Sequence, residues 1–156
     1  MKQIPVAVID FLHTQGFVVV SSIDKNGFPH SSCKDIVKIN PSGEIYLIDV
    51  YHGITRKNIE NNPQINISVV DEHKFIGYCL KGQAKLMPND NISQEIVKKW
   101  EDNITSRLAK RLLRNLVEDK GQRHHPEASL PQPKHLIVLC VEEIVDLAPQ
   151  HLRKEI

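Results

Sequence analysis

The chain has 156 residues, which is long enough for one domain with a hydrophobic core. Its net charge of +1 and ordinary composition exclude a global attraction to nucleic acid or membrane surfaces. No segment approaches the length of a membrane span, and the N-terminus lacks the apolar run of a signal peptide. The cysteines form no Cys-x-x-Cys pair, and the histidines show no metal-ligand spacing. We therefore expect a cytoplasmic protein without a metal site or a nucleic-acid partner.

The first half of the chain predicts a short helix followed by strands. Residues 4–14 carry apolar side chains at helical spacing, and Gly16 ends that pattern. The sequences DKNG and NPSG are turn signals between runs rich in β-branched residues. A second short helix is expected at about 55–61. The strands expected in this half are residues 17–23, 28–39, 44–50, 65–71 and 75–87.

The second half begins with a change of period. Residues 91–121 show the 3.6-residue period of a helix, which we interpret as an insertion into a β fold. Residues 122–134 are rich in proline and predict a loop, and 135–147 predict a last strand. Hairpins make neighbouring strands antiparallel, and closure of the sheet removes its exposed edges. The chain therefore predicts a single, mainly β domain with added helices, built as a six-stranded antiparallel barrel.

The segment GITRKNIENNP, residues 53–63, is a candidate phosphate site. Thr55 is a plausible N-cap for the short helix, and Arg56 and Lys57 follow in its first turn. A cation is disfavoured at the positive end of a helix unless an anion is bound there. The alternative is a capped surface helix whose charges face water.

Two charged residues interrupt apolar strands and are further candidates. Alternation places Ser32 and Lys34 on one face of a strand, and Cys33 and Asp35 on the other. Lys34 lines a cleft or, alternatively, protects an edge strand. Asp49 ends an apolar strand, where it either contacts a flat ligand or begins the turn into the next helix.

A basic stripe runs along the helix expected at 91–121. Its members share one face at i, i+3, i+4 and i+7, and are Arg107, Lys110, Arg111 and Arg114. Leucines occupy the opposite side, which predicts that they pack on the barrel; they are Leu108, Leu112, Leu113 and Leu116. The alternative is a nucleic-acid-binding face, but no aromatic platform accompanies it.

Several pieces of the chain occur in the order typical of one protein family. They are FVVVSSIDKNGFPHSS, EIYLIDVYHGITRKNIENNPQINISVVD and FIGYCLKGQAKL, within residues 5–87. The chain resembles the FMN-binding split-barrel proteins related to pyridoxamine 5'-phosphate oxidase. The resemblance implies a split-barrel homodimer with FMN in a cleft between the subunits. It implies an FMN-dependent oxidoreductase.

The resemblance also assigns nine residues to the cofactor. The FMN phosphate is expected at Thr55, Arg56 and Lys57. The strand beside the isoalloxazine ring is expected to include Ser32, Cys33 and Lys34. The strand end that contacts the ring and the ribityl chain is expected to include Ile48, Asp49 and Val50.

The C-terminal sequence DLAPQHLRKEI departs from the vitamin oxidase. It keeps Leu147 and Pro149 but has no Trp or Arg ahead of them, so oxidation of pyridoxamine phosphate itself is not expected. Split barrels also bind haem or a deazaflavin, sometimes as carriers. A haem ligand would have to be His30 or His52. A non-enzymatic binding module that uses the basic stripe is the remaining alternative.

Overall fold

The structure, a computed structural model, describes residues 1–51, 53–88, 92–117, 133 and 135–153. Most of the loop expected at 122–134 and the candidate His52 therefore lie outside the described residues. None of the described helices is long and apolar enough to cross a membrane. The elements, in chain order, are α1 (Val6–Thr14), β1 (Val18–Ile23), β2 (Pro29–Asn40), β3 (Glu44–Asp49), α2 (Ile54–Asn61), β4 (Gln64–Asp71), β5 (Ile76–Pro88), α3 (Gln94–Val117), β6 (His135–Asp146) and a 3-10 helix, η3 (Gln150–Leu152).

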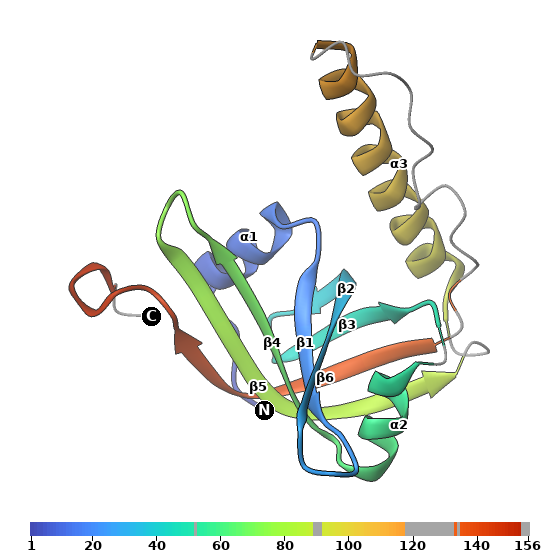
Figure 1. The fold of residues 1–156 in the computed structure, drawn as a ribbon, viewed down its shortest axis with the longest axis vertical. Coiled ribbons are helices and arrows are strands. Elements are labelled where there is room, and N and C mark those ends of the chain that lie inside the picture. Colours follow the sequence, from blue (N-terminus) through green and yellow to red (C-terminus); the bar gives the residue numbers. More distant parts are fainter. Residues whose placement is uncertain (52, 89–91, 118–132, 134, 154–156) are drawn as a thin grey trace.

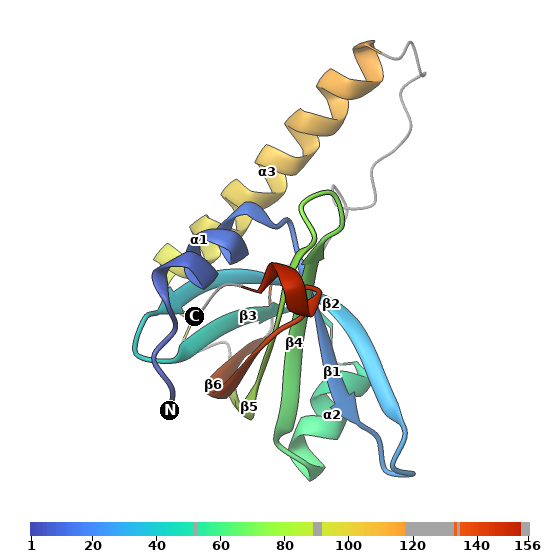
Figure 2. The ribbon, with the colours of Figure 1, turned by 90° about the vertical axis from the view of Figure 1, so that its left-hand side faces the viewer.

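The strands form a closed barrel in the order β1-β2-β3-β6-β5-β4, and every neighbouring pair is antiparallel. Pairing of β1 with β4 closes the sheet, so no strand edge of the barrel is left open. The helices α1 and α2 lie at opposite ends of the barrel, and α3 extends away from it as an arm (Figures 1 and 2). The mainly β, six-stranded antiparallel split barrel expected from the sequence is confirmed.

The barrel interior is the main hydrophobic core. Alternation decides which side chains enter it: Val18 and Val20 of β1 are buried, whereas Val19 between them is exposed. Leu47 and Ile45 of β3 enter the same core. Alternate residues of each strand thus point to the apolar interior of the barrel and to its outer face.

Two glycines are required by the strand connections. Gly27 ends the DKNG turn with φ of 84°, and its N–H donates to the Asp24 carbonyl oxygen. Left-handed backbone of this kind favours glycine, as the Asn-Gly hairpin signal predicts. At Gly82 the β5–β6 register shifts, and a Cβ there would lie 2.0 Å from the Cys140 carbonyl oxygen. A side chain at position 82 would therefore disrupt the bulge.

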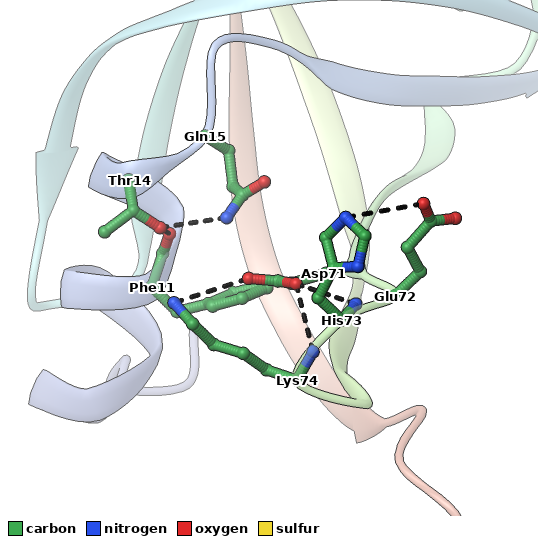
Figure 3. Close-up of polar contacts among 7 residues, drawn as sticks. All are labelled: Phe11, Thr14, Gln15, Asp71, Glu72, His73 and Lys74. Carbon is green, nitrogen blue, oxygen red and sulfur yellow. Dashed lines mark hydrogen bonds and ion pairs between the residues drawn. The ribbon is translucent and has the colours of Figure 1, made fainter.

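The β4–β5 turn is closed by its own side chains and lies beside the C-terminal end of α1 (Figure 3). Asp71 Oδ1 accepts hydrogen bonds from the backbone N–H groups of His73 and Lys74, both at 3.1 Å. The Lys74 ammonium lies 3.4 Å from Oδ2. Desolvation raises the pKa of Asp71, but these donors and the Lys74 charge outweigh it and lower that pKa overall. The turn is therefore held together by one carboxylate.

The arm α3 contacts the outer side of the barrel through a different face from the one predicted. Trp100, which is 3% exposed, packs with Val37 and Ile48 in a second apolar cluster. Leu112 and Leu113 are 44% and 64% exposed, so the prediction that they pack on the barrel is wrong. The reason is geometric: the N-terminal part of α3 lies against the barrel, and the rest of the helix extends beyond it (Figures 1 and 2).

Candidate functional site

Three of the segments expected to hold a cofactor meet at one place in the fold. The side chain of Ser32 on β2 lies 2.8 Å from the Thr55 hydroxyl at the start of α2. Two residues further along β2, Lys34 Nζ donates to Asp49 Oδ1 at 2.6 Å, at the end of β3. Both contacts arise on the same face of β2, as the alternation in the sequence predicts. They join β2, β3 and α2 into a single polar cluster.

The Lys34–Asp49 ion pair is almost completely enclosed. The Lys34 side chain is 13% exposed and the Asp49 side chain 1%. Lys34 does not protect an edge, because β2 is paired on both sides with β1 and β3. Among the described residues, no group donates a hydrogen bond to Asp49 Oδ2, which is buried. A buried carboxylate oxygen without a donor is costly, so this atom is suited to accept a hydrogen bond from a ligand.

The start of α2 differs from the prediction. The N-cap is Gly53, in extended backbone, and no side chain caps the helix. Thr55 is therefore not the N-cap, because its hydroxyl is held by Ser32 and the helix already begins at Ile54. Without a capping oxygen, the N–H groups of the first turn are directed to solvent or to a bound anion. A helix start without a side-chain cap is better suited to bind an anion than a capped one.

The two cations of α2 have different surroundings. Arg56 Nε donates to Glu60 Oε1 at 2.8 Å, and its Nη1 contacts Nε2 of His135 on β6. A guanidinium can only donate, so Nε2 of His135 is the acceptor in this contact. Lys57 is exposed at the surface of α2. Sequence reasoning missed His135, because only the strand order, with β6 beside β3, brings it to this site.

A cleft of about 210 Å³ lies on the opposite, outer side of β2. It holds the remaining predicted ring residues, Cys33, Ile48 and Val50, together with part of Lys34. The nine predicted residues thus occupy two faces, and Lys34 belongs to both. The other lining residues were not predicted from the sequence; they are Phe17, Asp35, Tyr51, Trp100 and Arg107.

The helix α3 supplies two of those missed residues. Trp100 forms a wall of the cleft, and Arg107 pairs with Asp35 through both carboxylate oxygens. Arg107 was predicted only as part of a basic stripe. The one available signal was the apolar period around Trp100, and that signal does not say which strand the helix covers.

In the described parts of the chain, no group of three or more His, Cys, Asp or Glu side chains is arranged to hold a metal ion. His30, the described candidate for a haem ligand, is half-buried near the beginning of β2, two residues before Ser32. The site is therefore polar and cationic at the start of α2 and largely apolar beside α3.

Comparison with solved structures shows the same fold in several proteins. HupZ of Group A Streptococcus is 23% identical, with 93% of this chain and 94% of that chain covered and a TM-score of 0.66. A Clostridium acetobutylicum protein of the pyridoxinephosphate oxidase family is 14% identical, with 95% and 96% covered and a TM-score of 0.57. An F420 reductase is 14% identical, with 83% and 88% covered and a TM-score of 0.51. At these identities the likeness establishes the fold alone.

Family membership comes from the sequence match. No curated protein matches the chain. The family model described as pyridoxamine 5'-phosphate oxidase, however, matches residues 4–147, which span both faces of the site. The chain therefore belongs to the pyridoxamine 5'-phosphate oxidase family.

Proposed function

We propose that this protein is a cytoplasmic FMN-dependent oxidoreductase that binds the cofactor between two copies of the chain. The observation that carries the proposal is the part-buried polar cluster of Ser32, Lys34, Asp49 and Thr55, in which the buried Asp49 Oδ2 lacks a donor among the described residues. It joins three segments that the family resemblance assigns to one cofactor. FMN would supply the redox chemistry, and the chain would bind and orient it.

The start of α2 fits the phosphate end of the cofactor. Its first-turn N–H groups have no side-chain cap, and Arg56 and Lys57 add positive charge beside them. Glu60 and His135 orient the Arg56 guanidinium. A phosphate there would accept from backbone N–H groups and from cations together, which is the arrangement that binds anions most strongly.

The polar cluster and the cleft fit the rest of the molecule. Asp49 Oδ2 would accept a hydrogen bond from a ribityl hydroxyl or a ring N–H. Lys34 has three donors and uses one on Asp49, so it can also donate to a ligand. The apolar side chains of Ile48, Val50 and Trp100 suit a flat ring.

A second copy of the chain is proposed as the partner. Phe17, just before β1, Val19 of β1 and Val70 of β4 are all exposed and line one surface depression. Phe17 also lines the cleft, so this apolar surface is continuous with the proposed ring site. Exposed apolar surface of this kind typically marks an interface.

Titration with FMN and riboflavin tests the proposal. Purified protein should be yellow or should bind added FMN. Lys57→Ala should weaken FMN binding by about tenfold, the order expected for one charge-assisted contact, and leave riboflavin binding unchanged. Lys85→Ala, an exposed lysine of β5, is the matched control. A colourless protein that binds no added FMN would contradict the proposal.

A deazaflavin such as F420 is the second candidate, favoured by the structural likeness to an F420 reductase. Haem is the third, with His30 as its described candidate ligand. Parallel titrations with FMN, F420 and haem separate the three. Saturable binding of F420 or haem without binding of FMN would replace the first proposal. Oxidation of pyridoxamine phosphate is not proposed, because the C-terminal Trp- and Arg-containing motif is absent.

A further inference from the structure

The cleft beside α3 has one wall that belongs to a separate element. Its other lining residues come from β2, β3 and the segments that adjoin β1 and β3, whereas Trp100 and Arg107 come from α3. We propose that Arg107 is a positioning residue that clamps α3 against β2, and that this clamp sets how tightly the cleft holds the ring of a bound cofactor. Only the identity of that ring rests on the function proposed above.

The contacts of Arg107 join three segments of the chain. Its Nη2 donates to Asp35 Oδ2 at 2.7 Å and its Nη1 to Asp35 Oδ1 at 3.1 Å. Nη1 also donates to the Gly16 carbonyl oxygen at 2.9 Å, in the link between α1 and β1. The Arg107 side chain is 18% exposed and the Asp35 side chain 15%. A two-point Arg–carboxylate pair fixes orientation as well as distance.

The clamp affects the cleft because Arg107 lies on the same helix as Trp100, which forms a wall of the cleft. Trp100 lies two helical turns before Arg107, on the same side of α3, and packs against Ile48. Asp35 is the register partner of Ile48 across β2 and β3. Arg107 and Trp100 therefore contact the same pair of strands, β2 and β3, at two points. Loss of the Arg107 contacts would leave the Trp100 wall attached mainly by its apolar packing and by the hydrogen bond that Asn103 Nδ2 donates to the Ile36 carbonyl oxygen at 3.4 Å.

FMN and riboflavin, which differ in the phosphate, can distinguish an effect of the clamp on the ring from an effect on the phosphate site. Arg107→Gln should weaken FMN and riboflavin binding by the same factor, about tenfold, because the ring is common to both. Lys57→Ala, by contrast, should weaken FMN binding alone. A fall in FMN affinity that exceeds the fall in riboflavin affinity would place Arg107 at the phosphate and overturn the proposal.

Trp100 reports on the cleft without any ligand. It is the only tryptophan of the chain, so the intrinsic tryptophan emission of the protein comes from this wall. Arg107→Gln and Asp35→Asn should shift the emission to the red and increase its quenching by acrylamide. Arg107→Lys, which keeps the charge but loses the two-point geometry, should give an intermediate shift. Arg114→Gln, on an exposed part of the same helix, is the matched control and should change nothing.

These measurements test the Arg107 clamp and the proposed FMN function separately. Unchanged Trp100 emission in folded Arg107→Gln, or unchanged flavin affinity in it, overturns the clamp. If Arg107→Gln does not fold, Arg107→Lys and Asp35→Asn are judged by the same two measurements. If the wild-type chain binds no flavin, the FMN proposal fails, and Trp100 emission alone then supports or overturns the clamp.

Discussion

The two faces of β2 differ in how their partners reach them. On the inner face, Ser32 and Lys34 contact Thr55 and Asp49, which lie within the next few elements of the chain. On the outer face, Asp35 contacts Arg107, which is 72 residues away on α3. The inner site is thus built by neighbouring strands of the barrel, whereas the outer cleft depends on a separate element.

The ion pairs on the two faces also differ in burial. Asp49 is 1% exposed, whereas Asp35 and Arg107 both keep some contact with water. Removing one partner of a buried pair leaves an uncompensated charge, and this penalty is largest where the remaining or removed group is fully enclosed, as Asp49 is. We therefore expect the inner pair to govern stability and the outer pair to govern the shape of the cleft.

The largest effect is expected at the inner pair. Asp49→Asn should lower the free energy of unfolding by about 3–5 kcal/mol, because Lys34 then stays buried without its counter-charge. Urea denaturation measures this. The control is Lys81→Gln, which removes an exposed pair with Glu143 and should cost at most about 1 kcal/mol. Equal effects at the two pairs would show that the Lys34–Asp49 pair is solvated.

The next effect concerns the anchor of α2. Asn58 Nδ2 donates to Ser22 Oγ at 3.0 Å, and both residues are buried. Asn58→Ala should cost about 1–3 kcal/mol, because the Ser22 hydroxyl loses its donor in a dry environment. Asn61→Ala, at an exposed position of the same helix, should cost clearly less. A similar cost at both positions would argue against a buried bond.

A smaller effect on stability is expected for Ser32 and Cys33, which are adjacent residues on opposite faces of β2. Ser32→Ala removes the hydrogen bond with Thr55 and should cost about 0.5–1.5 kcal/mol. Cys33→Ala, at an exposed position, should stay within about 0.5 kcal/mol of the wild type. Thermal unfolding of the two variants compares the faces directly. A larger cost for Cys33→Ala would reverse the assignment of inner and outer face.

The smallest effect is expected in the β4–β5 turn, away from both faces. The pKa of Asp71 is lowered by folding, so its contribution to stability is present above the unfolded value of about 3.9 and is lost as pH falls through the folded value. The stability difference between the wild type and Asp71→Asn should therefore be present at pH 7 and disappear in acid. A difference that persists in acid would mean that Asp71 does not act through its charge.

Most of the fold could be predicted because its signals are local. The Asn-Gly hairpin and the alternation in β1 depend on residues that are close in sequence, and the structure follows both. The faces of β2 were also predictable from period two, since Ile36 packs on the barrel core and Val37 lies under α3. The start of α2 was mistaken, because Thr55 satisfies its hydroxyl through Ser32 rather than through its own helix.

The rest of the site could not be predicted because its contacts are distant in sequence. No local pattern says that His135 reaches Arg56 or that Arg107 reaches Asp35. The leucines of α3 gave a misleading signal, because an apolar stripe predicts burial only where there is something to pack against. Contacts of this kind depend on strand order and on the direction of a long helix.

The most direct test of the account is a titration of the flavin-free protein with FMN, followed through Trp100 emission. Flavin in the cleft beside Trp100 would quench this single tryptophan by energy transfer. We expect saturable quenching that accompanies flavin binding, and we expect Arg107→Gln to weaken the binding of FMN and of riboflavin equally. Flavin binding that leaves Trp100 emission unchanged, or no flavin binding at all, would contradict this expectation.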